Sequence, residues 1–267
     1  QTCALPILAS KIGIIEIFCE KRRKGMESLY IVMPAYNEEK NIKKVVKQWY
    51  AVLDGKAENS KLVIADSGST DRTHEILIEL QKEYPKIEIL EDTEQYHGPK
   101  LIALYDYAIK NKCDYIFQTD SDGQTNPDEF AAFWNMRKEY SGVFGNRTVR
   151  GDGKDRAFVE KVVCFLLRMY FGVKVPDANA PFRLMKTDVV KKYLYKIPYN
   201  YNLPNIMLVT YYAYCGEKLF FHEISFQSRQ AGVNSINIPK IVKIGWKALG
   251  DFHSFRKEMK NEFKRKN

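Results

Sequence analysis

Short apolar runs alternate with helical periods along most of the chain. From Leu29 onwards, runs rich in β-branched and aromatic residues predict strands at 29–33, 62–65, 87–90, 115–119 and 142–145. Between the strands, apolar residues recur at helical spacing, as at Ile42, Val45, Val46, Trp49, Leu101, Leu104, Tyr105 and Ala108. This alternation predicts one α/β domain, in which a mainly parallel sheet carries helices on both faces.

Polar segments follow three of the predicted strands. They are residues 34–39 (Pro-Ala-Tyr-Asn-Glu-Glu), 66–71 (Asp-Ser-Gly-Ser-Thr-Asp) and 119–124 (Thr-Asp-Ser-Asp-Gly-Gln). In open parallel sheets, ligands bind beyond the carboxyl ends of the strands. We therefore expect Asp66, Asp120 and Asp122 to share one crevice.

The third segment carries two carboxylates one residue apart. Asp120 and Asp122 can converge on one hard divalent cation, with the side-chain carbonyl of Gln124 as a third oxygen ligand. A cation held by few protein oxygens keeps open positions, which suit the phosphates of a nucleotide. The alternative is a polar turn in which Asp and Gly serve the backbone geometry.

The first two segments suit a nucleoside or a helix start. Tyr36 offers an aromatic face for a base, and Glu38 and Asp66 can bond a ribose or a base edge. Alternatively, Asn37 caps a helix with two glutamates in its first turn. For Ser69, Thr70 and Asp71, we expect the helix start to be the main role.

Taken in order, the three segments resemble the inverting nucleotide-sugar glycosyltransferases of family two, and within it the polyprenyl-phosphate and dolichol-phosphate sugar transferases. The resemblance runs from about residue 29 to 252 and implies the Rossmann-like A-type glycosyltransferase fold. It implies a nucleoside-diphosphate sugar donor, Mn²⁺ or Mg²⁺ held by Asp120, Asp122 and Gln124, and contact of Asp120 with the donor diphosphate. The implied nucleoside contacts are Pro34, Ala35, Tyr36, Glu38 and Asp66.

Two later segments extend the resemblance. Residues 176–183 resemble the family's acceptor-side segment, which makes Asp177 the candidate general base; it could instead position the acceptor or form a loop turn. Residues 227–235 resemble a segment in which Arg229 would pair with the sugar diphosphate, an arrangement that suits its planar guanidinium. The alternative is a surface arginine.

Two loops complete the expected site region. Residues 97–100 (His-Gly-Pro-Lys) precede a predicted helix, and its amides and Lys100 can touch the donor phosphates or sugar. We expect His97 itself to be polar loop surface. Residues 147–154 are rich in glycine and charge and predict a mobile loop.

Composition narrows the classes of partner. Lys and Arg number 42 against 33 Asp and Glu, and the net charge of +9 suits anionic partners. The five cysteines form no Cys-x-x-Cys pair, which favours a reducing cytosol over a disulfide framework or a zinc site. No phosphate-loop or Gly-x-Gly-x-x-Gly motif follows a strand. The dispersed charge and the lack of a recognised motif predict no nucleic-acid partner.

The two ends raise the question of a membrane. We expect residues 1–25 to be a non-native extension before a start at Met26, or else a short membrane-binding segment. Residues 26–235 form the expected catalytic domain, and residues 236–267 a basic amphipathic helix and tail. Lys240, Lys243 and Lys247 share one stripe, and Trp246 and Phe252 could enter a membrane interface. Alternatively, this helix packs on its own domain.

Together, these features predict an inverting glycosyltransferase that uses a nucleoside-diphosphate sugar, with a polyprenyl phosphate as the preferred acceptor. We expect it in the cytoplasm, peripheral to the membrane. The alternatives are transfer to a saccharide or other hydroxyl in cell-envelope glycan synthesis, and a catalytically silent nucleotide-binding protein associated with the membrane.

Overall fold

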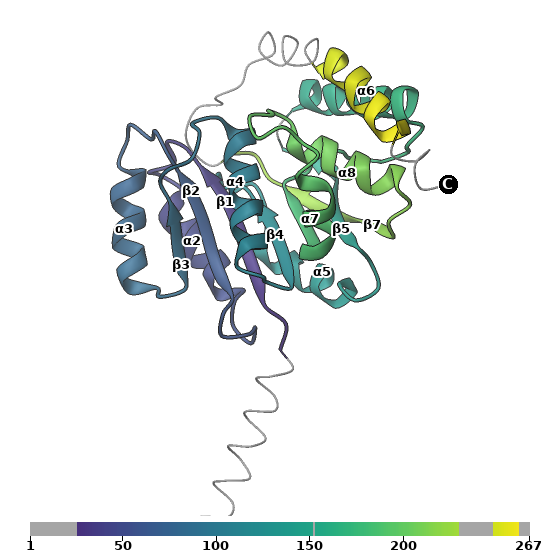
Figure 1. The fold of residues 1–267 in the computed structure, drawn as a ribbon. Helices are drawn as coiled ribbons and strands as arrows, with labels where there is room; N and C mark the ends of the chain where they lie inside the picture. The colour runs from purple at the N-terminus through teal and green to yellow at the C-terminus, as the bar shows by residue number, and fades with distance from the viewer. Residues whose placement is uncertain (1–25, 152, 230–247, 262–267) are drawn as a thin grey trace, which may run out of the picture.

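The structure is a computed structural model that describes residues 26–151, 153–229 and 248–261 (Figure 1). Within these residues, seven strands form one sheet in the order β3-β2-β1-β4-β6-β5-β7. Only β6 runs against its neighbours, so the sheet is mainly parallel, as predicted. The strands are β1 (Leu29–Ala35), β2 (Lys61–Asp66), β3 (Ile87–Leu90), β4 (Tyr115–Thr119), β5 (Gly142–Arg150), β6 (Phe182–Lys186) and β7 (Leu219–Phe226).

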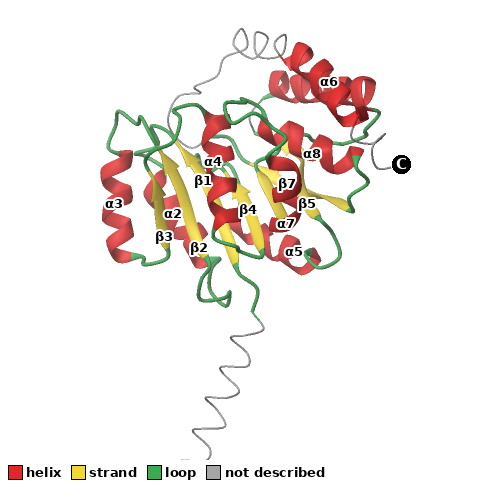
Figure 2. Ribbon diagram, viewed as in Figure 1, coloured by secondary structure: helices red, strands yellow, loops and turns green. Residues whose placement is uncertain are grey.

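Helices cover both faces of the sheet (Figure 2). The α-helices are α2 (Ile42–Ala51), α3 (Thr73–Glu83), α4 (His97–Lys110), α5 (Phe130–Met136), α6 (Lys154–Phe171), α7 (Thr187–Leu194) and α8 (Pro204–Tyr214). A short 3-10 turn, η1 (Pro127–Glu129), leads into α5, and Asn126 caps it through its side chain. A further helix spans residues 248–261.

The pleat of the strands divides the core into two layers. In β1, Tyr30 and Val32 face a cluster that includes α4, α7 and α8. Leu29, Ile31 and Met33 face the opposite cluster, which includes α2, α3 and α5. This alternation is the period of two expected of a strand, and here both faces are apolar because both are covered.

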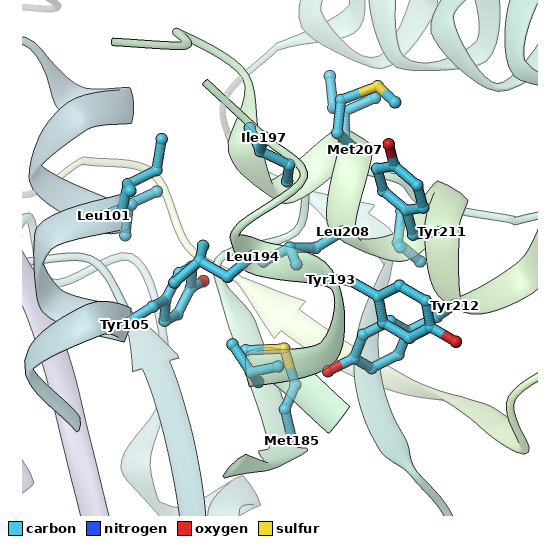
Figure 3. Close-up of a cluster of buried hydrophobic side chains, with 14 of the residues drawn as sticks. Leu101, Tyr105, Met185, Tyr193, Leu194, Ile197, Met207, Leu208, Tyr211 and Tyr212 are labelled. Atoms are coloured by element: carbon cyan, nitrogen blue, oxygen red, sulfur yellow. The ribbon is translucent and has the colours of Figure 1, made fainter. Parts of the chain in front are cut away.

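Helix α8 lies inside the first of these layers. Residues 204–212 are all buried, and its polar exceptions, Asn205 and Thr210, have hydrogen-bond partners. Figure 3 shows how its apolar side chains meet those of α4 and α7. Tyr193 of α7 stacks on Tyr211, with ring centroids 5.7 Å apart. The layer therefore holds α8 firmly beneath the loop that follows β4.

One sequence expectation about loops is wrong. Strand β5 continues to Arg150, and Val149 and Arg150 pair with β7, so residues 147–150 belong to a strand rather than to a mobile loop. The register shifts between Asn146 and Val149, where the strand is irregular. Such an irregularity re-aims side chains, and Arg147 lies within it.

The C-terminal helix packs on the domain. Phe252 is buried, and its ring lies 5.6 Å from that of Phe171 in α6. Phe255 similarly packs against Tyr201, at 5.2 Å. The expectation that Phe252 enters a membrane is therefore wrong, because its apolar surface is already covered. Lys240, Lys243, Trp246 and Lys247 lie outside the described residues, as do residues 1–25.

No helix in the described ranges is long and apolar enough to cross a membrane.

Candidate active site

The expected site lies where β1, β2 and β4 end at one edge of the sheet. Ala35 pairs with Asp66 in the parallel register of β1 and β2, so the first two polar segments leave the sheet side by side. The hydroxyl of Ser121 donates a 2.8 Å hydrogen bond to the carbonyl of Pro34, which ties the third segment to the first. All three polar segments therefore meet.

The first two segments are joined by their own polar side chains. The backbone amide of Asn37 donates to Ser69 Oγ at 3.1 Å, and that of Glu38 donates to Thr73 Oγ1 at 2.7 Å. The side chain of Asn37, which has a left-handed φ of 55°, accepts from the amide of Thr70 at 2.8 Å. These hydrogen bonds join the loop after β1 to the loop after β2.

The helix-start reading of these segments fails in detail. Helix α2 begins at Ile42 and α3 at Thr73, and neither has a side-chain cap. Asn37 is thus no cap, because Asn41, four residues later, occupies the position before α2. Asp71 accepts from the amide of Thr73 at 3.0 Å, which keeps a local turn role.

Lys100 links the first two polar segments. Its buried ammonium donates to the carbonyl of Ala35 at 2.6 Å and to that of Ser67 at 2.9 Å. It also lies 5.3 Å from the centre of the exposed Tyr36 ring. Burial lowers the pKa of Lys100 to about 8, and the charge of Asp66 opposes this. In this structure Lys100 holds two loops together, while His97, at the start of α4, is exposed as expected.

Asp66 is buried at the end of β2. Its carboxylate accepts from the hydroxyl of Ser69 and lies 3.2 Å from Nδ1 of His74. The first loop thus offers the aromatic face of Tyr36, and the second offers the carboxylate of Asp66.

Asp120 and Asp122 are held at the end of β4. Asp120 accepts from Gln118 Nε2 at 3.1 Å, and Asp122 accepts from the amide of Gln124 at 3.1 Å across a turn at Gly123. Burial raises the pKa of both carboxyls, and the charge of Asp120 raises that of Asp122 further.

This donor set fits a hard divalent cation. Two neighbouring carboxylates whose ionisation burial opposes would be stabilised by a dication between them. Among the described residues, no group of three or more His, Cys, Asp or Glu side chains forms a closed metal cluster.

Gln124 makes a different contact. Its side-chain Nε2 donates to the backbone carbonyl of Gln227 at 2.7 Å, and its backbone carbonyl accepts from the backbone amide of Gln227 at 2.9 Å. Gln124 thereby fixes the segment after β7 beside the acidic turn. Its role as a third metal ligand stays a prediction.

Arg229 follows this fixed segment and reaches the first loop. Its guanidinium pairs with Glu38, which also accepts from Asn41 at 2.8 Å. Burial raises the pKa of Glu38 to about 7, although Asn41 and Arg229 oppose the shift. The charge of Arg229 also acts on Asp120 and Asp122. The guanidinium of Arg229 therefore lies near enough to the acidic turn for its charge to favour the ionised carboxylates.

A second group of charges stands on the other side of Asp120. Asp177 is buried and accepts four hydrogen bonds: 2.7 and 2.8 Å from the Arg147 guanidinium, 3.3 Å from the Arg147 amide and 3.1 Å from the Asn179 amide. Burial alone would raise the pKa of Asp177, but Arg147 outweighs it and holds the pKa below the usual value. Arg147 also pairs with Glu160 of α6 at 3.2 Å.

Arg183 holds the acceptor-side loop from beneath. It is buried in β6 and donates to the carbonyls of Ala178, Ala180 and Asn205. Glu160 accepts from the amide of Ala178 at 2.7 Å. Residues 177–180 are thus fixed by β5, β6, α6 and α8 together.

A buried chain of hydrogen bonds runs from the core to Asp120. The Tyr105 hydroxyl donates to Asn205 at 2.8 Å, Asn205 donates to Gln118 at 3.2 Å, and Gln118 donates to Asp120 at 3.1 Å. Sequence reasoning missed this chain and Arg147. Gln118, two residues before Asp120 in a buried strand, was the available signal, since a buried amide needs partners.

The comparisons with known proteins agree with this geometry. Residues 30–194 match the family model described as "Glycosyl transferase family 2". The dolichyl-phosphate beta-glucosyltransferase of Trichomonas vaginalis is 32% identical over 107 residues, which cover 38% of this chain and 32% of that protein. The undecaprenyl-phosphate 4-deoxy-4-formamido-L-arabinose transferase of Edwardsiella ictaluri is 24% identical over 177 residues, or 64% of this chain and 53% of that protein. The chain thus spans about a third to a half of the length of these two relatives.

A solved structure supports the fold. Glucosyl-3-phosphoglycerate synthase from Mycobacterium tuberculosis, in complex with Mn²⁺, uridine diphosphate and glucosyl-3-phosphoglycerate, superposes with a TM-score of 0.62. The match has 16% sequence identity and covers 89% of this chain and 82% of that one. At this identity, the likeness extends to the fold.

Proposed function

The chain belongs to glycosyl transferase family 2, and we propose from this premise that it transfers a sugar from a nucleoside-diphosphate donor to a polyprenyl phosphate, with inversion. One observation carries the proposal. Asp120 and Asp122 lie at the sheet edge between two loops suited to a nucleoside and the guanidinium of Arg229.

The donor would occupy the crevice along this edge. Tyr36 and Asp66 would contact the nucleoside, beside the backbone of Pro34 and Ala35. Glu38 would hold Arg229 toward the diphosphate until the donor arrives, because the two side chains are paired. Lys100 would act through Ala35 and Ser67, whose carbonyls it holds.

Asp120 and Asp122, with Gln124 as the third proposed ligand, would hold Mn²⁺ or Mg²⁺. Solved structures of glucosyl-3-phosphoglycerate synthase contain either ion together with uridine diphosphate. When bound, such an ion neutralises charge on a departing diphosphate. Arg229 would share that role through charge-assisted hydrogen bonds.

The acceptor is inferred from Asp177. A hydroxyl acceptor needs a general base, and a base needs an oxygen that can receive the proton. The four hydrogen bonds to Asp177 occupy about all the lone-pair positions of a carboxylate. A phosphate acceptor is already anionic near neutral pH, because its second pKa is about 6. The geometry therefore favours a phosphate acceptor, with Asp177 as a positioning residue that orders the acceptor-side loop.

The reaction then needs little proton transfer. A phosphate oxygen of the acceptor attacks the anomeric carbon of the sugar, the bond from that carbon to the diphosphate breaks, and the electron pair leaves with the diphosphate. The two named relatives carry dolichyl phosphate and undecaprenyl phosphate in their names, which supports a lipid phosphate as the acceptor. Such an acceptor places the protein at the cytoplasmic face of a membrane.

The experiment is a transfer assay with a panel of UDP- and GDP-sugars, Mn²⁺, and a short polyprenyl phosphate that dissolves in water. We expect at least one donor to give a sugar-phosphate-prenyl product and free nucleoside diphosphate. Product formation only with saccharide acceptors would favour the alternative of glycan hydroxyl transfer. Binding of nucleotide-sugar without turnover on any acceptor would favour a silent nucleotide-binding protein.

A further inference from the structure

Helix α6 has an inner face that packs on the domain and an outer face that is exposed. Its inner face carries Leu167 and Phe171, which are buried in the core, and Glu160, which holds Arg147 and the amide of Ala178. The acceptor-side loop therefore leans directly on this helix. None of these contacts involves the outer face of the helix.

The outer face is a continuous apolar stripe. Its side chains are large and exposed, and their spacings of four, three and four positions put them on one side of a helix with 3.6 residues per turn. They are Phe158 (68% exposed), Val162 (39%), Phe165 (60%) and Met169 (61%). Single exposed apolar residues are ordinary, but a clustered stripe marks an interaction surface.

Basic side chains border the stripe. Lys161 and Arg168 are exposed and seven positions apart, so they lie along one edge of it. The helix at 248–261 packs beside α6 through Phe252 (Figure 1). Its exposed charged side chains are three basic residues and one acid: Arg256, Lys257, Lys260 and Glu258. Asp155 is an exposed acid of α6 and lies in the first turn, away from these residues.

This combination selects one occupant. An apolar stripe with large side chains, edged by Lys and Arg, is the pattern of a helix that lies in the plane of a membrane interface. A second copy of the chain would bring its own basic edge to the same place, and like charges would repel. An anionic headgroup layer satisfies both the stripe and its edge.

We propose that the outer face of α6 docks into the headgroup and acyl boundary of an anionic membrane. The inference deepens the proposed function and rests on it, since docking would place the acceptor-side loop close to the lipid phosphate. The loop at 177–180 is fixed to the inner face of the same helix, whose diameter is about 10–12 Å. Thus one helix would set the distance from the membrane to the reacting phosphate.

The test is co-sedimentation of the full chain with vesicles of phosphatidylcholine, with and without phosphatidylglycerol, at low and high salt. We expect binding to the anionic vesicles that falls with salt. A Phe165→Ser, Met169→Ser double variant should bind at least about tenfold more weakly. Lys161→Ala and Arg168→Ala should each weaken binding roughly fivefold, with the loss confined to anionic vesicles.

The matched control is Phe220→Ser. Phe220 is another partly exposed aromatic residue, near the amino end of β7 and therefore at the opposite edge of the sheet from the acidic turn. It should bind vesicles as the wild type does. Thermal unfolding of every variant checks that each is folded.

Turnover on the water-soluble short prenyl phosphate separates this inference from the proposed function. The α6 variants should keep that turnover and lose turnover on a long-chain acceptor embedded in vesicles. Equal vesicle binding by wild type and α6 variants would overturn the docking surface while leaving the transferase proposal intact. So would a wild-type protein that ignores vesicles, whether it is a monomer or a dimer whose association the α6 variants abolish.

Discussion

The environment of the Asp177 carboxylate bears on whether this residue acts as a general base or as a positioning residue. Arg147 supplies three of its four hydrogen bonds and holds its pKa below the usual value, which works against the proton affinity that a general base needs. The same bonds fix a loop that an acceptor would contact. The type and position of this residue alone suggested a general base. Its pairing with Arg147 of β5 is what favours a positioning role instead.

The first prediction concerns this distinction. Asp177→Asn should leave turnover on a prenyl phosphate within about tenfold of wild type, whereas loss of a true base costs about 10²–10⁴-fold. It should instead lower the free energy of unfolding by about 3 kcal/mol or more, because the buried Arg147 loses a charged partner. Steady-state kinetics and urea unfolding measure the two effects. A thousandfold loss of turnover in a stable variant would restore the base.

Glu38 gives a prediction about pH. Its pKa in the folded state is raised to about 7 from an ordinary 4.5, so the native state holds the proton more tightly than the unfolded state. Stability from this group is full below pH 4.5 and is lost as the pH rises through 7. Glu38→Gln mimics the protonated form. It should be more stable than wild type by about 1–3 kcal/mol at pH 8.

The gain should shrink toward zero near pH 4.5. Chemical unfolding of both proteins between pH 5 and 8.5 measures it. A Gln variant that is less stable than wild type at pH 8 would mean that the ion pair with Arg229 outweighs the cost of burial.

At the scale of elements, the acidic turn depends on side chains of α4 and α8 that reach it only through β4. Tyr105 of α4 and Asn205 of α8 orient Gln118 of β4, and Gln118 orients Asp120. Partners behind a metal ligand are worth about 10- to 100-fold in metal affinity. We expect Gln118→Leu to weaken Mn²⁺ binding by about that amount, because Asp120 loses the donor that aims it.

Electron paramagnetic resonance of free Mn²⁺ measures this affinity without reference to turnover. Tyr105→Phe serves as the comparison, since it removes one hydroxyl two bonds further away and should change Mn²⁺ affinity by much less. Equal Mn²⁺ affinity in wild type and Gln118→Leu would make the hydrogen-bond chain a feature of the core alone.

The elements also show which parts of the fold the sequence could predict. Strands β1 to β4 were predicted because each is an apolar run that ends in polar turn residues. Strand β6 was missed because Arg183 and Lys186 interrupt its apolar pattern, and the structure accounts for Arg183 by three backbone carbonyls. Helix α8 was missed because it is apolar all round and has no periodic face to detect.

The site divides in the same way. The meeting of Asp66 with the acidic turn follows from parallel strands ending at one edge, so local sequence was enough. The Asp177–Arg147 pair joins residues 30 positions apart through an irregular strand, and no local pattern encodes it. Burial of Phe252 likewise depends on Phe171, whose position is set by the packing of α6.

At the scale of the whole molecule, the edge of the sheet carries the proposed donor site. Helix α6, beside it, carries the proposed membrane contact. The edge of the sheet brings together an aromatic face, two carboxylates and a guanidinium. They come from the two loops after β1 and β2, from the acidic turn and from Arg229. On the acceptor side, α6 connects the fixed loop at 177–180 to an apolar outer stripe. This arrangement would allow the proposed soluble donor and the proposed lipid acceptor to meet in one domain.

The central claim is that Asp122 holds a divalent ion for transfer from a nucleotide-sugar, and one paired measurement tests it. Metal-dependent release of nucleoside diphosphate is compared between wild type, Asp122→Asn and Asp128→Asn. Asp128 is an exposed acid of the same loop region, in η1, and is the matched control. We expect Asp128→Asn to match wild type and Asp122→Asn to lose roughly a hundredfold or more in turnover, with its melting temperature retained. Wild-type turnover and Mn²⁺ affinity in Asp122→Asn would contradict the account.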